Sequence, residues 1–346
     1  MSEIEVSILS GPDAACDEFV RHAPGAKLCH LPTWSFAIQQ SLGHRNCYLV
    51  ARADGTVRGV LPLTYIRSLL FGRRLVSEAF ASYGGPLAAD DHARDALFDR
   101  AVKLARELGC RAIQFRGERE LPYDLYHPQE KVSMRLPLMS DPEEMWKSFK
   151  SSTKVRNHIR KAEKAGVTAT PGREELLGEF YDVYTRRMAQ LGTPCYPRRL
   201  FAALLEAFPD NCQIFMARMD GQTVGARMVF CFRQMVESIW GITRTEYNHY
   251  SPNHLLYWKV FQHYCVRGAK WFDFGPSPVE TGSHEFKKQW GAIEVPLYYQ
   301  YWLPEGAAHD LPALSNQKYQ RSVELWKKLP LWLTRLLGPA ISRGLP

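Results

Sequence analysis

Residues that could do chemistry lie close together between positions 273 and 288. Asp273 stands between Phe272 and Phe274, so its carboxylate is costly to bury unless it caps a backbone group or pairs with a cation such as Lys287. Lys287 and Lys288 are compact cations of the kind that suits a phosphate or a developing oxyanion. We expect one of these lysines to be simply solvated. The pattern predicts a site for an anion, or for a reaction that builds up negative charge.

The surrounding sequence predicts a polar loop held between two buried strands. Residues 271–274 read WFDF, which is typical of a strand with both faces covered. The sequence GPSP at 275–278 predicts that strand pairing stops there, because proline has no amide to donate. Charged and aromatic residues then alternate, which places the lysines at a strand edge, and a second aromatic strand is expected at 297–301. Ser277 and His284 are weaker candidates in the same region.

One pattern occurs twice in the chain. Residues 51–59 and residues 217–225 both read ARxDGxxxG, and in each copy Asp-Gly joins two β-rich runs, which is a strong hairpin signal. A helical segment follows each copy, at 92–108 and at 253–267, and each segment ends at a glycine before a buried strand. The sequence therefore predicts two copies of one mixed α/β (α+β) domain. We place the first domain at residues 1–140 and the second at 141–302.

A basic segment separates the two copies. Residues 143–165 are expected to form a helix on which Arg156, Arg160 and Lys164 share one face. Such a face is usually solvated, and a nucleic-acid backbone or a diphosphate is the sharper alternative.

The second copy has the better-defined helix start. Ser251-Pro252 predicts an N-cap oxygen followed by a proline in the first helical position. The amides of the first turn, beside Asn253, would then be free to bind a phosphate or a polarised carbonyl. A plain capped helix is the alternative.

Composition is that of a globular protein. The chain has 346 residues, of which 45% are hydrophobic, and a net charge of +8 that hints at an anionic partner. The eight cysteines form no CxxC pair, which argues against a zinc site and a disulfide scaffold. The sequence has no P-loop, no GxGxxG motif after a strand and no nucleophile elbow, which argues against kinases, dehydrogenases and hydrolases. We see neither a signal peptide nor a spanning segment, so we expect a cytoplasmic protein.

The C-terminal residues 303–346 are expected to form an extension. Residues 323–343 mix large apolar side chains with Lys and Arg, which suits a peripheral contact with the inner membrane. Pro330 predicts that no single helix runs through this segment. Packing on the first domain is the alternative to membrane contact.

These motifs together resemble one known family. The sequence SSTKVRNHIRKAEKAGV, followed by YSPNHLLYW, FDFG and HEFKKQWG, looks like the FemAB/FemX family, whose members carry two tandem acetyltransferase-like (GNAT) domains. The segment WKKLPLW resembles more particularly the FemAB-like proteins of PEP-CTERM/exosortase and exopolysaccharide systems. The resemblance implies that an acyl or aminoacyl group moves from charged tRNA or acyl-CoA to an amine or hydroxyl. It implies no metal, no tightly bound cofactor and no covalent enzyme intermediate.

The resemblance also implies roles for single residues. Lys287, in the FK motif, resembles the family lysine at the tRNA end, and Arg156 resembles a basic helix position that faces the substrate cleft. Asp273 would be the base or its orienter, and Tyr250, from its place before the helix, could protonate a leaving oxygen. Further candidates for substrate or carrier binding are Arg160, Asn253, Ser277, His284 and Phe286.

One position departs from the family pattern. Fem enzymes that bind the nucleotide-linked cell-wall precursor carry a lysine shortly after an early tryptophan, but Trp34 is followed here by SFAIQQ. A saccharide of an exopolysaccharide or lipid-linked kind, or a peptide, is therefore the expected acceptor, and Tyr83 with the two glycines after it could contact it. Two alternatives stay open: an acyl-CoA-dependent transferase, and a catalytically silent GNAT-like binding protein of a polysaccharide or export assembly.

Overall fold

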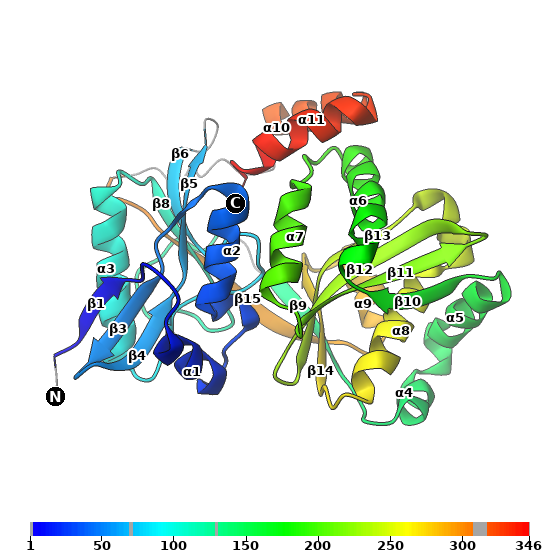
Figure 1. Ribbon diagram of the computed structural model, residues 1–346, viewed down its shortest axis with the longest axis horizontal. Helices are drawn as coiled ribbons and strands as arrows, with labels where there is room; N and C mark the ends of the chain where they lie inside the picture. Colours follow the sequence, from blue (N-terminus) through cyan, green and yellow to red (C-terminus); the bar gives the residue numbers. More distant parts are fainter. Residues whose placement is uncertain (1–2, 69–71, 129–130, 307–316, 346) are drawn as a thin grey trace. The chain divides into compact units, whose positions relative to one another are not determined.

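The computed structural model describes the chain except for residues 1–2, 69–71, 129–130, 307–316 and 346 (Figure 1). The chain forms two compact units. The first unit consists of Met1–Lys131, Pro296–Gln320 and Ala340–Pro346, and the second consists of Val132–Val295 and Arg321–Pro339. Each unit therefore includes a part of the C-terminal segment that the sequence predicted to be a separate extension.

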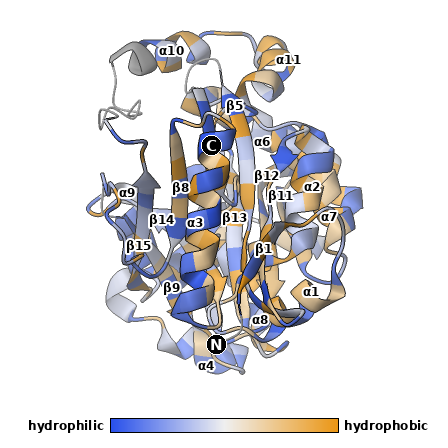
Figure 2. Ribbon diagram, turned by 90° about the vertical axis from the view of Figure 1, so that its left-hand side faces the viewer, coloured by the Kyte–Doolittle hydropathy of each residue, from blue (hydrophilic) through white to orange (hydrophobic). Residues whose placement is uncertain are grey.

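The first unit contains two groups of paired strands. One sheet has the order β1 (Glu5–Ile8), β3 (Leu49–Ala53), β4 (Thr56–Leu61) and β7 (Leu87–Ala88). The other strands follow the order β15 (Ile293–Trp302), β8 (Ala112–Gly117), β6 (Gly72–Ser77), β5 (Leu63–Ser68) and β2 (Arg45–Asn46). Helices α1 (Ala14–His22), α2 (Pro32–Leu42) and α3 (Asp91–Glu107) complete it. Polar and apolar residues alternate along α3 (Figure 2), whose buried residues include Leu97, Ala101 and Leu104, and these join the core of this unit.

The second unit is one mixed sheet with helices on both faces. Its strands follow the order β10 (Thr168–Gly172), β11 (Cys212–Met219), β12 (Gln222–Phe232), β13 (Met235–Thr243), β14 (Trp271–Ser277) and β9 (Lys131–Pro137). Successive side chains of a strand point to opposite faces. Phe215 therefore contacts Tyr264 of α8 (Pro252–Cys265), whereas Phe230 and Trp240 pack toward Phe201 on the other face. That face is covered by α6 (Leu177–Leu191) and α7 (Arg198–Ala207).

Both predicted hairpins are present and are built alike. The β3–β4 turn passes through Asp54 (φ 49°) and Gly55 (φ 78°), and the β11–β12 turn passes through Asp220 (φ 50°) and Gly221 (φ 74°). Left-handed backbone at both central positions is the geometry of a type I′ turn. In each hairpin the strand register shifts at the Ala-Arg step of the repeat. The internal repeat predicted from the sequence is thereby confirmed as a repeat of structure.

Strands β13 and β14 pair at one end only. Parallel pairing joins Met235–Glu237 to Trp271–Asp273. β13 then continues along β12, whereas β14 pairs with β9 from Trp271 to Ser277. The strands therefore separate, and the β14-facing edge of β13 from Ser238 to Thr243 has no strand partner among the described residues.

The single helix predicted over 143–165 is wrong. The structure has two helices, α4 (Pro142–Ser148) and α5 (Val155–Lys164), with a short 3-10 turn, η2 (Ser151–Thr153), between them. Serine and threonine side chains compete with helical hydrogen bonds, and Lys154 adopts a left-handed backbone there (φ 59°).

The polar stretch after WFDF also differs from the prediction. β14 runs on to Ser277 through an irregularity in register between Asp273 and Pro276, where a proline is tolerated. The lysines then lie on a helix, α9 (Gly282–Lys288), and not at a strand edge. The helix forms because the Thr281 hydroxyl accepts a hydrogen bond from the His284 amide, which caps its first turn.

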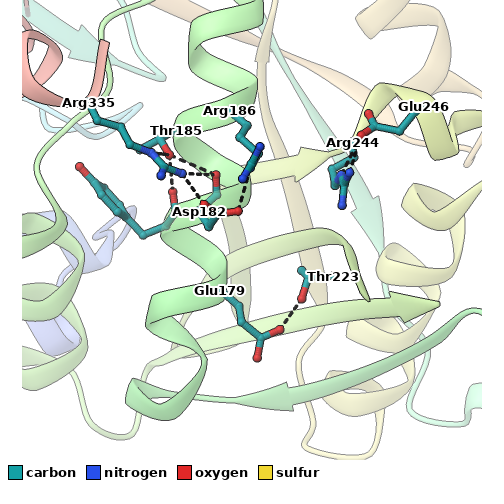
Figure 3. A network of polar contacts seen from close by, with 9 residues as sticks. Glu179, Asp182, Thr185, Arg186, Thr223, Arg244, Glu246 and Arg335 are labelled. Carbon is teal, nitrogen blue, oxygen red and sulfur yellow. Dashed lines mark hydrogen bonds and ion pairs between the residues drawn. The ribbon is translucent and has the colours of Figure 1, made fainter. Parts of the chain in front are cut away.

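The C-terminal segment forms α10 (Gln317–Lys327) and α11 (Leu331–Ser342), which are interrupted around Pro330 as predicted. Arg335 donates to the Asp182 carboxylate and to the Thr185 hydroxyl on α6 (Figure 3). Arg321–Pro339 thus belongs to the second unit, which the sequence did not offer as an alternative, whereas Pro296–Gln320 and Ala340–Pro346 belong to the first. Residues 307–316 of the predicted extension lie outside the described residues. In the described part of the chain, every helix is too short or too polar to cross a membrane.

Candidate active site

A cavity of about 440 Å³ lies in the second unit where β13 and β14 separate. α6, β12, β13, β14, α8 and α9 all contribute to its wall. The described residues that line it include three cations, Arg187, Arg227 and Lys287, and no Asp or Glu. The cavity thus combines the unpaired edge of β13 with an excess of positive charge.

Lys287 is buried in the wall of this cavity, with 7% of its surface exposed. Its ammonium group donates to the carbonyl oxygens of Gly275 (2.8 Å) and Pro276 (3.0 Å), which fixes its position. Burial lowers the pKa of Lys287 to about 8; the Asp273 carboxylate opposes the shift and the Arg227 guanidinium adds to it. A cation with two of its three N–H groups engaged can still donate one hydrogen bond to a ligand.

Arg227 lies in the middle of β12 and is 4% exposed. Its Nη1 donates to the Ser238 hydroxyl (2.5 Å) and its Nη2 to the Asn253 side-chain oxygen (2.8 Å). The guanidinium lies 3.6 Å from the centre of the Tyr257 ring, a cation–π contact. Its Nε is buried and has no hydrogen-bond partner among the described residues. A side chain at Gly241 would collide with this group, since an added Cβ would come within 2.3 Å of Nη1.

The Asp273 carboxylate is occupied by structural contacts. Its carboxylate is 1% exposed and accepts from the Ser133 hydroxyl (2.6 Å), from Arg135 Nε (2.9 Å) and from the Gly275 amide (2.7 Å). The ion pair with Arg135 replaces the pairing with Lys287 that the sequence left open. Because the carboxylate fixes the backbone whose Gly275 carbonyl holds Lys287, its geometry suits an orienting group better than a base.

The other sequence candidates in this unit divide into two groups. Asn253 and Phe286 line the cavity, and the Ser277 hydroxyl lies 3.2 Å from that of Ser283, which also lines it. His284 instead contacts Glu294 (Nε2 to Oε1, 2.9 Å), and the Tyr250 ring lies tilted against that of His249 in the 3-10 helix η4 (Thr245–Tyr250); neither belongs to the lining.

The predicted start of α8 is partly correct. Pro252 occupies the first helical position, but the Ser251 side chain does not cap the helix. Its hydroxyl is 3.0 Å from His158 Nδ1 on α5, because Ser251 adopts a left-handed backbone (φ 62°). Arg156 and Arg160 also lie on α5, outside the cavity lining, and Arg160 rests on the Trp146 ring.

Tyr83 lies in the first unit, where it lines a separate cavity of about 210 Å³. Gly84 and Gly85 line the same cavity, as do Lys27 and Arg116. The Lys27 ammonium stands 4.8 Å from the centre of the Tyr83 ring.

Sequence reasoning missed Arg187 and Arg227. Arg227 had a detectable signal, because it is a single charge inside the apolar run VGARMVF of a predicted strand. A charge at such a position is expected to have a special partner or function. Arg187 had none, since it is one of two adjacent arginines on a helix with mixed polarity.

One protein-family model matches part of the chain. The family model described as "Acetyltransferase (GNAT) domain" matches residues 150–288, which include the lysine and the arginines of the cavity. No curated protein matches the chain.

Solved structures share the fold at low sequence identity. The crystal structure of FemX has 16% identity and a TM-score of 0.64, over 94% of this chain and 100% of that one. A tandem GNAT protein from the clavulanic acid biosynthesis pathway has 14% identity and a TM-score of 0.56, over 89% and 100%. L-PGS from Bacillus licheniformis has 14% identity and a TM-score of 0.55, over 96% and 98%. The chain therefore has the tandem GNAT fold, with a GNAT acetyltransferase domain over residues 150–288 that supports an acyltransferase activity.

Proposed function

We propose that the second unit transfers an acyl or aminoacyl group from an activated carrier to an amine or hydroxyl by direct attack. The observation that carries this proposal is the cavity between the separated strands β13 and β14, with the buried Lys287 in its wall. The cavity lies within the segment that matches the GNAT domain. Charged tRNA and acyl-CoA are both candidate donors.

The unpaired edge of β13 is suited to hold the donor. Its backbone groups between Ser238 and Thr243 can pair with an extended amide-containing arm, much as a sheet edge binds an added strand. The pantetheine arm of an acyl-CoA contains such amides. This is the observation that favours acyl-CoA, whereas the FK motif favours charged tRNA by family resemblance.

Lys287 is placed to act on the charge that develops during transfer. The nucleophile adds to the acyl carbon and the carbonyl oxygen becomes negative. The C–S or C–O bond to the carrier then breaks, and the proton of the nucleophile passes to the leaving sulfur or oxygen. A fixed ammonium group stabilises that oxygen in the transition state. Asp273 has an indirect role, since it holds the Gly275 backbone that positions Lys287. Tyr250 receives no role in this step, because it lies outside the cavity lining.

We propose that the cavity of the first unit binds a part of the acceptor other than its reacting group, the acceptor being a saccharide or peptide of the cell envelope or of an exopolysaccharide. Tyr83 lines this cavity with the small exposed part of its side chain (2%), and Lys27, which lies over its ring, pairs with Glu118 (2.7 Å). Tyr83→Ala should weaken binding of a matching acceptor oligosaccharide by at least about tenfold in calorimetric titration, the order expected for losing one aromatic anchor. Unchanged affinity would remove the acceptor site from this cavity.

We also propose peripheral membrane contact through residues 323–343. Leu325, Trp332 and Leu336 are about two-thirds exposed (65%, 66% and 67%), and Lys327 and Lys328 are exposed nearby. Purified protein should sediment with vesicles that contain phosphatidylglycerol, and the double variant Trp332→Glu/Leu336→Glu should lose this binding. Equal sedimentation of both proteins would contradict the proposal.

The donor is identified by equilibrium binding. Wild type, Lys287→Ala and the matched control Lys288→Ala, whose side chain is exposed on the same helix, are titrated with charged tRNA and with coenzyme A. Transfer is then measured in a single-turnover assay. The Lys287 variant should lose activity by two to three orders of magnitude, roughly the cost of one oxyanion donor, and the Lys288 control should not. Binding of neither donor, with full function of Lys287→Ala in the cell, would mean a silent binding protein.

A further inference from the structure

The cavity of the second unit carries more positive charge than the transfer step requires. We infer that it binds a carboxylate carried by one of the two substrates, with Arg227 as the central contact and Arg187 and Lys287 beside it. That the ligand is a substrate rests on the proposed function, whereas the anion site itself rests on the contacts and burial of these three cations.

Two buried cations of this cavity have only uncharged partners among the described residues. Arg227 is 96% buried and Lys287 is 93% buried, taking the complement of their exposed fractions of 4% and 7%. The partners of Arg227 are a hydroxyl, an amide oxygen and an aromatic ring, all of them uncharged. No ion pair joins Arg227 or Lys287 to a carboxylate in the described part of the chain, although the nearby Asp273 forms one with Arg135. Since buried charges are normally paired, these two cations suit the site to an anionic ligand.

The Arg227 guanidinium is held in one position by its neighbours. Ser238 and Asn253 fix two of its five N–H groups, and the Tyr257 ring covers one of its faces. Its buried Nε carries an unused donor. Glycine at position 241 is what leaves room for the group. Burying a guanidinium and holding it in one position costs desolvation free energy and conformational entropy. Hydrogen bonds to a ligand with two acceptor oxygens would offset that cost.

The shape of the guanidinium favours one kind of anion, a carboxylate. A planar guanidinium with fixed partners matches the two coplanar oxygens of a carboxylate, and it is the side chain best suited to that recognition. Phe274, Phe286 and Tyr257 also line the cavity, so an apolar spacer between the carboxylate and the reacting carbon has aromatic surface to cover. A short dicarboxylic acyl group or an amino-acid acceptor has these properties.

The test uses glutarate as the probe and glutaramide as its uncharged match. Isothermal titration is performed on the full-length wild type and on Arg227→Gln, with Arg227→Lys as a variant that keeps the charge but loses the planar fork. Arg187→Gln is compared with its neighbour Arg186→Gln, since Arg186 pairs with Asp182 and does not line the cavity. Circular dichroism and melting curves establish that each variant is folded.

We expect glutarate to bind the wild type and glutaramide to bind at least tenfold more weakly. Arg227→Gln should lose at least tenfold in glutarate affinity, Arg227→Lys should fall between the two, and Arg187→Gln but not Arg186→Gln should bind more weakly than wild type. Equal binding of glutarate and glutaramide, an unchanged affinity in folded Arg227→Gln, or tighter binding of inorganic phosphate than of glutarate would each overturn the proposal.

Two further titrations show which substrate carries the carboxylate and whether the anion site and the proposed transferase activity fail independently of each other. Glutaryl-CoA binding more tightly than pentanoyl-CoA, with the advantage lost in Arg227→Gln, places the carboxylate on the acyl donor. Equal binding of the two, with free glutarate still binding beside them, places it on the acceptor. If glutarate binds while neither coenzyme A nor charged tRNA does, the anion site stands and the transferase fails; the reverse result overturns the anion site alone.

Discussion

Replacing Lys287 by methionine should change how the stability of the protein depends on pH. Methionine has a similar length and no charge, so it removes the titrating group while filling most of the space. The lysine is suited to this test because it is buried and its pKa is lowered from the ordinary 10.5 to about 8. Below pH 8 both the folded and the unfolded chain hold the proton, and the folded state bears the full cost of the buried charge.

The sign and size follow from proton linkage. Between pH 8 and 10.5 the folded lysine has released its proton while the unfolded lysine keeps it, so stability rises with pH in this window. Each tenfold change in proton affinity is worth about 1.4 kcal/mol, which gives about 3 kcal/mol over the whole window. Wild type should therefore gain about 2 to 3 kcal/mol relative to Lys287→Met between pH 7 and 10.

The assay is urea unfolding of both proteins at several pH values, followed by tryptophan fluorescence. Buried thiols and phenols, such as those of Cys212 and Tyr264, have raised pKa values and destabilise the fold as pH rises, but they do so in both proteins and cancel in the difference. Lys288→Met, which removes an exposed lysine from the same helix, should keep the wild-type pH dependence. A flat difference between wild type and Lys287→Met from pH 8 to 10 would refute the reasoning, because it would mean that the folded state does not disfavour the Lys287 cation.

Three further outcomes are expected. If the cation of Lys287 is what stabilises the transition state, kcat/KM should fall about tenfold per pH unit above about pH 8; a rise above that pH would assign the lysine as a base. Gly241→Ala should push the Arg227 guanidinium aside and weaken glutarate binding at least tenfold, measured by calorimetry, with a change in melting temperature of only a few degrees. Gly338→Val should displace α11, because an added Cβ already lies 2.7 Å from the Cys195 sulfur, and limited trypsin digestion should then cleave the C-terminal helices faster. Ala340→Val, at an exposed position on the same helix, is the control, and equal cleavage rates of the two variants would contradict this packing.

Much of the fold could be predicted because the signals were local. The Asp-Gly pairs determine their hairpins by themselves, since both residues must adopt left-handed backbone and few others do so readily. The repeated order of hairpin, helix and strand then indicated two copies of one domain. Pro330 likewise interrupted the C-terminal helices where the sequence predicted it. These features depend on residues a few positions apart.

The site was predicted only in part, for a different reason. Lys287 and Asn253 were named from motifs, and both line the cavity. Asp273 was correctly seen as a buried carboxylate that could cap a backbone group, as it does at the Gly275 amide, but its charged partner is Arg135, which lies far away in the sequence on the antiparallel strand β9. The sequence gives no register between such strands, so it could not choose Arg135 over the lysine on α9.

The sequence by itself determined the type of fold, the two hairpins and the lysine on which the proposed chemistry depends. Only the tertiary structure decided that β13 and β14 separate, and that the gap brings Arg187, Arg227 and Lys287 to one cavity with no acid among its described lining residues. Strand separation is a property of how β14 is shared between two neighbours, and the charge of a cavity is a sum over elements distant in the chain. Neither quantity is local, and this is why periodicity and motifs could not supply it.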